Sequence, residues 1–115
     1  MTNTPILAVH PKELARAWNE TLPEVLNASD KATVTADERD ANVLNIHIQT
    51  AGRSMYSFDF RCTYVDSREV KVDVIDVERD NVVTDERNDI VQSLIEDYVR
   101  HIHECAQRLK GMTNG

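Results

Sequence analysis

The segment from residue 84 to residue 110 carries an apolar stripe at helical spacing, and this stripe constrains the fold more than any other feature. Apolar side chains recur three or four residues apart, as on the buried face of an amphipathic helix. Thr84 is expected to cap this helix, and Gly111 is expected to end it in a left-handed conformation. Such a helix needs an apolar layer to pack on. The stripe consists of Ile90, Val91, Leu94, Ile95, Tyr98, Val99, Ile102, Cys105, Ala106 and Leu109.

Four shorter stretches before this helix alternate apolar and polar residues, which is the pattern of half-buried β-strands. They cover residues 32–36, 44–49, 56–64 and 70–74. The polar connections between them are short enough for hairpins. The strands are therefore expected to form an antiparallel meander with one buried face and one solvent-exposed face.

Matching the apolar faces of neighbouring strands predicts a register, because paired residues lie on the same side of a sheet. The register that the apolar residues choose also places Arg61 opposite Asp73 on the outer face, and this pairing of opposite charges supports it. The predicted pairs are Ile48 with Tyr56, Tyr64 with Val70, and Arg61 with Asp73.

A first helix is expected to begin at Pro11, since proline suits the first helical position. Its apolar face includes Leu14, Trp18 and Leu22. Pro23 lies inside this pattern and lacks a backbone donor, so a kink or break is expected near residues 21 and 22. The whole chain, residues 1–115, is therefore expected to be one two-layer α+β domain, ordered α-β-β-β-β-α, with both helices on one face of a four-stranded antiparallel sheet.

Composition excludes several classes of function. The 13 basic and 20 acidic residues give a net charge of −7, which repels phosphate backbones and anionic membrane surfaces. No segment has the roughly 18 consecutive apolar residues of a membrane span. The three glycines, at positions 52, 111 and 115, form no phosphate-binding loop. We therefore expect no nucleic-acid partner, no membrane partner and no cofactor.

The densest group of metal-ligand side chains is His101, His103 and Cys105. On a helix His101 and Cys105 share a face, whereas His103 points away from them. Zinc needs three or four converging ligands, so no metal site is expected. Cys62 and Cys105 are both expected in the core as separate thiols, which fits a cytoplasmic protein.

One place departs from the simple pattern. If alternation persists after Val74, Ile75 and Val77 both fall on the outer face of the sheet. A β-bulge near residue 75 would instead turn Val77 inward. If there is no bulge, the outer face is covered there by a partner. The candidate partner surface then consists of Met55, Asp59, Arg61, Ile75 and Val77.

No motif in the chain identifies a reaction. The favoured hypothesis is a non-enzymatic interaction or assembly module that forms a homodimer or binds another protein. The alternative hypothesis is a small-molecule binder or enzyme with a pocket between the helices and the sheet. A deep polar pocket with two converging titratable groups would favour the alternative, and a large flat apolar patch would favour the interaction module. A measured solution mass would be the most informative single experiment.

Overall fold

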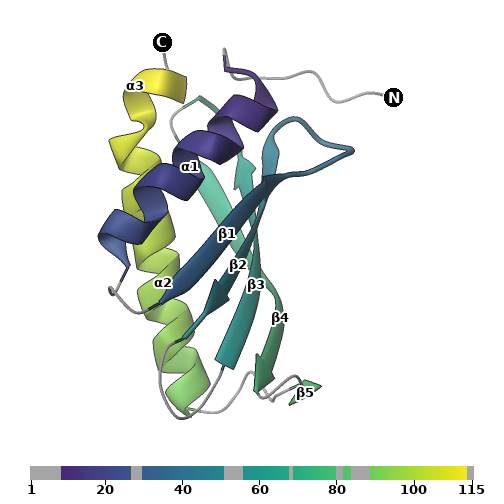
Figure 1. Ribbon diagram of the computed structural model, residues 1–115, viewed down its shortest axis with the longest axis vertical. Coiled ribbons are helices and arrows are strands. Elements are labelled where there is room, and N and C mark those ends of the chain that lie inside the picture. Colours follow the sequence, from purple (N-terminus) through teal and green to yellow (C-terminus); the bar gives the residue numbers. More distant parts are fainter. Residues whose placement is uncertain are drawn as a thin grey trace.

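The computed structural model describes residues 9–26, 30–50, 56–67, 69–79, 82–83 and 89–113. It has the expected two layers, with an antiparallel sheet on one side and two long helices side by side on one face of it (Figure 1). The order α-β-β-β-β-α is confirmed. No helix in the described ranges is long and apolar enough to cross a membrane.

Helix α1 spans Pro11–Val25 and begins where the sequence predicts. His10 caps it, because its Nδ1 accepts a hydrogen bond of 3.2 Å from the backbone N–H of Lys12. The expected break near residues 21 and 22 is wrong. Pro23 falls in the last turn, and the Leu26 N–H still donates to the Leu22 carbonyl at 3.1 Å, so the helical bonding resumes beyond the proline.

The sheet has the strand order β1-β2-β3-β4-β5. The first four strands form the predicted meander, and β5 is an addition that the sequence reasoning missed. Two residues make up β5, and they pair only with the end of β4, at Glu78 and Arg79. The strands are β1 Lys31–Ala36, β2 Val43–Gln49, β3 Tyr56–Tyr64, β4 Val70–Arg79 and β5 Val82–Val83.

The two central hairpins differ in how well their register was predicted. The β3–β4 register is confirmed at both predicted pairs, Tyr64 with Val70 and Arg61 with Asp73. In the β2–β3 hairpin Ile48 lies opposite Phe58. Its predicted pairing with Tyr56 is therefore wrong by two residues.

Thr50 explains this error. Its N–H donates to the Tyr56 carbonyl at 2.9 Å, and its hydroxyl accepts from the Tyr56 N–H at 3.1 Å. These bonds close the hairpin between Thr50 and Tyr56, so the loop holds five residues instead of the three assumed. A shift of two residues keeps every side chain on its predicted face.

Helix α2 spans Asp89–Arg108, and the short α3 spans Lys110–Thr113. The predicted cap Thr84 lies outside the described residues. Gly111 is inside α3 and does not adopt a left-handed conformation, so that expectation is wrong. The chain stays helical beyond residue 109, because the Leu109 carbonyl accepts hydrogen bonds from the N–H groups of Met112 and Thr113, at 3.0 and 3.2 Å.

The core has the predicted phase in both long helices and in the first four strands up to the bulge. Ile90 is an exception, because this first residue of the predicted stripe is 61% exposed at the start of α2. The inner face of the sheet packs on the apolar stripes of α1 and α2, with Val72 and Val74 half-buried at its margin. Cys62 and Cys105 are both buried and unbonded, as predicted. The largest fully buried side chains include Trp18, Leu22, Phe58, Phe60 and Ile102.

Candidate interaction surface

The outer face of the sheet is the one that α1 and α2 leave uncovered (Figure 1). Side chains on this face form rows, because residues paired across antiparallel strands lie side by side. One row contains Thr35, Asn45, Arg61 and Asp73. The next row contains Thr33, His47, Asp59 and Asp76. The face therefore has a polar, mixed-charge surface.

A β-bulge in β4 settles the alternative that the sequence left open. Phe60 pairs with Val74 and Asp59 pairs with Asp76, so Ile75 is an extra residue between them. Ile75 stays on the outer face and is 54% exposed. Val77 turns into the core and is 1% exposed.

The bulge changes the candidate partner surface. Val77 is removed from it by burial, and Met55 lies outside the described residues. Half-buried Asp59 and exposed Arg61 remain on the outer face with Ile75. The structure thus places three of the five candidate residues on one face.

His47 and Asp59 form a polar pair that the sequence reasoning missed. They are opposite each other in the register, and His47 Nδ1 lies 2.7 Å from Asp59 Oδ1. A carboxylate can only accept a hydrogen bond, so Nδ1 carries the hydrogen. The predicted register would have placed His47 opposite Ser57 instead, and this is why the pair was hidden. Both side chains are nearly half exposed, as expected for an open sheet face.

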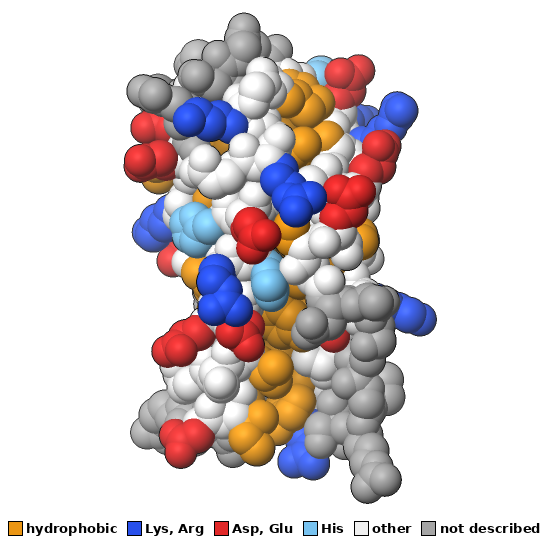
Figure 2. Space-filling view, turned by 90° about the vertical axis from the view of Figure 1, so that its left-hand side faces the viewer, with side chains coloured by type: hydrophobic (Ala, Val, Ile, Leu, Met, Phe, Trp, Pro, Cys, Tyr) orange, Lys and Arg blue, Asp and Glu red, His pale blue; other side chains and the backbone are white. Residues whose placement is uncertain are grey.

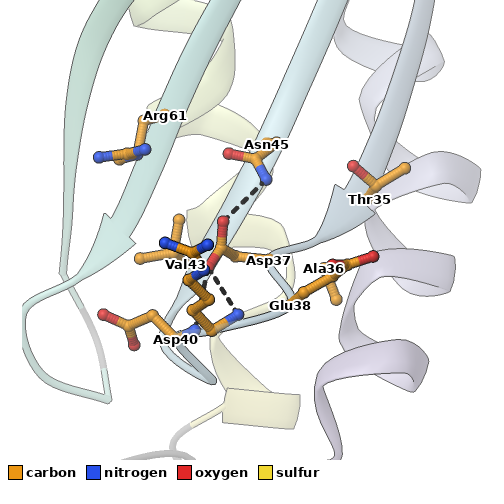
Figure 3. Close-up of a pocket in the computed structure, with 9 residues that line it drawn as sticks. Thr35, Ala36, Asp37, Glu38, Asp40, Val43, Asn45 and Arg61 are labelled. Carbon is orange, nitrogen blue, oxygen red and sulfur yellow. Dashed lines mark hydrogen bonds between the residues drawn. The ribbon is translucent and has the colours of Figure 1, made fainter. Parts of the chain in front are cut away.

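A cavity of about 740 Å³ lies where this face meets the β1–β2 loop (Figure 3). Asn45 Nδ2 donates to Asp37 Oδ1 at 3.2 Å, and Arg61 lies farther along the sheet. The other oxygen of Asp37 accepts from the N–H groups of Arg39 and Asp40, at 3.0 and 2.9 Å. These hydrogen bonds, the one from Asn45 first, hold the pKa of the Asp37 carboxyl below its usual value. The Asp37 carboxylate therefore stabilises the loop.

The buried thiols are poorly suited to nucleophilic chemistry. Burial raises the pKa of the Cys105 thiol to about 12, and burial also raises the pKa of Cys62 above its usual range. A thiol must ionise to act as a nucleophile or metal ligand. Within the described ranges no three Asp, Glu, His or Cys side chains converge as metal ligands. His101 Nδ1 lies 3.6 Å from Glu104 Oε1, too far for a hydrogen bond, and His103 is exposed.

The free edge of β1 is closed by a side chain. The Asn19 amide of α1 donates from Nδ2 to the Val34 carbonyl and accepts at Oδ1 from the Val34 N–H, both at 2.7 Å. These are the two backbone groups that an added strand would bind. The side chain thus takes the place of a neighbouring strand at the middle of β1.

The edge of β4 is open over residues 70–74. The Val65 N–H donates to the Glu69 carbonyl at 3.0 Å, which makes this a hydrogen-bonded pair. Antiparallel pairs alternate between bonded and non-bonded, so the N–H and C=O groups of Val70, Val72 and Val74 point away from β3. No strand in the described part of the chain pairs with β4 there, because β5 reaches only Glu78 and Arg79.

The helix side of the molecule carries scattered charges of both signs (Figure 2). Apolar side chains form a narrow strip in the lower half of that view. At the start of α2, Ile90 is 61% exposed. Among the described residues on this side, no cluster of basic side chains is visible that would attract a polyanion.

Comparison with known proteins does not assign this chain to a family. No family model matches the chain, and no curated protein or solved structure is detectably similar to it. Function must therefore be argued from the surfaces described above.

Proposed function

We propose that the protein is a non-enzymatic interaction module that self-associates in the cytoplasm through the β4 side of its sheet. The observation that carries this proposal is Ile75, a large apolar side chain that is 54% exposed beside the open edge of β4. Soluble proteins usually cover an exposed strand edge or place charged side chains on it. A partner that covers Ile75 and the edge would remove both from water.

The polar surroundings of Ile75 fit a reversible contact. Arg61 and Asp73 pair across β3 and β4 on the same outer face, and the acidic Asp59 lies next to the bulge. Interfaces between folded proteins commonly have an apolar centre with a polar rim. Ile75 would supply the apolar contact, and these charges would supply the rim.

The cavity at the β1–β2 loop is the observation that favours the alternative, a small-molecule binder. It lies on the outside of the sheet, while the centre of the space between the helices and the sheet is filled by side chains such as Trp18 and Phe58. Two of its three carboxylates already accept hydrogen bonds from the protein. Asp37 accepts three, and Asp40 accepts one from the Asn42 N–H at 2.9 Å. The cavity therefore offers a ligand fewer free polar partners than its size suggests, and we favour the interaction module.

The experiment is a comparison of Ile75→Asp with Ile90→Asp by sedimentation. Both isoleucines are more than half exposed, so both variants are expected to fold. Ile75→Asp should shift the protein from dimer to monomer, since it places a charge in the contact. Ile90→Asp should remain dimeric. Equal behaviour of the two variants would exclude Ile75 from the contact.

A further inference from the structure

We propose that β4 pairs antiparallel with β4 of a second copy of this chain, with Val72 opposite Val72, so that the two sheets join into one. This inference rests on the proposed self-association and specifies its contact. The open edge runs from the β3–β4 turn to the bulge at Ile75, and Val72 is at its centre. Pairing centred two residues away in either direction would run into the turn or into the bulge.

The backbone groups at this edge have the alternation that such pairing needs. The N–H and C=O groups of Val70, Val72 and Val74 point away from β3, in the plane of the sheet. This direction follows from the hydrogen bond between Val65 and Glu69. In a twofold arrangement Val72 would bind its own equivalent, and Val70 would bind Val74 of the second copy. About six hydrogen bonds would form, two for each bonded pair.

The side chains of the same segment complement one another in this register. Lys71 of each copy falls opposite Asp73 of the other, and the twofold axis makes this contact occur twice. These are non-bonded pairs of the ladder, in which the two Cα atoms approach to about 4.5 Å and the side chains are closest. Within one chain the Lys71 Nζ already lies 3.8 Å from Asp73 Oδ2, on the same exposed face. The segment is thus self-complementary in charge.

The charged side chains that lie side by side across the two paired β4 strands would alternate in sign. Arg61 is opposite Asp73 within one chain, and Asp73 would be opposite Lys71 of the second copy. Opposite charges on facing strands favour the pairing, and like charges oppose it. Sliding the two strands by two residues would set Lys71 against Lys71 or Asp73 against Asp73. Sliding them by one residue would set backbone groups that point away from β3 against backbone groups that are already bonded to β3.

The inner face of the edge also has room for a second copy. Val72 and Val74 are only half-buried, and a groove of about 220 Å³ runs beside the start of β4. The groove is lined by Val70 of β4, by Glu69 just before this strand, and by His103, Ala106 and Gln107 from α2. Pairing at the edge would extend the apolar layer and cover these valines.

Closure of the opposite edge limits the assembly to two chains. Asn19 occupies the backbone groups of Val34, so β1 has no free site at its centre for another strand. One open edge per chain gives a closed twofold dimer, whereas two open edges would permit a fibre.

The test is a charge-exchange experiment with Lys71→Asp and Asp73→Lys. Each variant alone would set like charges opposite each other twice, so each should dimerise at least about tenfold more weakly than the wild type. A mixture of the two should recover dimers, because a carboxylate then faces an ammonium group at both contacts. Lys31→Asp makes the same charge change on β1 and should leave dimerisation unchanged.

A second measurement keeps the test decisive if a charge variant folds poorly. Lys71→Cys mixed with Asp73→Cys should form a disulfide-linked dimer under oxidising conditions, while neither variant alone should. The native Cys62 and Cys105 thiols are buried and should not take part. A wild-type protein that is monomeric would overturn both this inference and the proposed function. A wild-type dimer without recovery or cross-linking in the mixtures would overturn only the edge pairing.

Discussion

The amide of Asn19 holds both backbone groups of Val34, with two hydrogen bonds of 2.7 Å. The same amide nitrogen also donates to the Ala15 carbonyl at 3.0 Å, which fixes its orientation on α1. One side chain therefore closes an edge of the sheet and ties the first helix to it. Among the described residues the two edges of the sheet are consequently unequal, because the centre of β1 is occupied and β4 is open over residues 70–74.

Replacing Asn19 by Ala should destabilise the fold by about 1–3 kcal/mol, because the N–H and C=O of Val34 lose partners at a half-buried position. Urea denaturation measures this cost. The variant should also form species larger than a dimer at high concentration, since the β1 edge is opened. Glu20→Ala, at the exposed neighbouring position on α1, should change stability by less than about 0.5 kcal/mol. Equal effects of the two substitutions would contradict the closure of the edge.

Phe58 should be among the most costly side chains to truncate. It is fully buried, and its ring lies 5.3 Å from Tyr98 and 6.1 Å from Phe60 between centroids. Phe58→Ala should lower the free energy of unfolding by about 3–5 kcal/mol. Val65→Ala, at an exposed apolar position, should cost less than about 0.5 kcal/mol. A cost for Phe58→Ala below 1 kcal/mol would place the ring outside the core.

Asp37 should make the β1–β2 loop sensitive to acid. Its hydrogen bonds from Asn45 and from the Arg39 and Asp40 N–H groups lower the pKa of the folded state. Its contribution to stability is therefore present above the unfolded pKa of about 3.9 and is lost as pH falls through the lower, folded value. Asp37→Ala should destabilise the protein at pH 7, and the difference from wild type should shrink near pH 3. A difference that stays constant down to pH 2 would contradict this role.

The buried thiols should make the protein sensitive to alkali. Burial raises the pKa of Cys105 to about 12 and raises that of Cys62 as well. Their contribution is fully present below the unfolded pKa of about 8.5 and is lost as pH rises toward the folded values. The urea midpoint should fall between pH 8 and pH 11. A thiol reagent at pH 8 should modify both cysteines only after denaturant is added, and rapid modification of the native protein would refute their burial.

The layers and the faces of this fold follow from the sequence because they depend on periodicity. Alternation assigned Phe58 and Phe60 to the core, and the helical stripe did the same for Tyr98 and Ile102. These side chains keep their face even when a strand slides by two residues, so the error at Ile48 did not disturb the core.

The features of the candidate surface were harder to predict because they depend on register and on single side chains. The His47–Asp59 pair required the hairpin length that Thr50 sets. The closure of the β1 edge required knowing that Asn19 reaches a strand 15 residues away. Periodicity carries no information about either contact. The bulge at Ile75 was detectable, since two apolar residues broke the alternation there.

The mass of the wild-type protein in solution, measured by sedimentation equilibrium over a range of concentrations, tests the central claim most directly. The account predicts a reversible transition to twice the 13.1 kDa mass of one chain, with no larger species. A mass of one chain at every concentration up to about 1 mM, where even an association worth only about 4 kcal/mol would be visible, would contradict it.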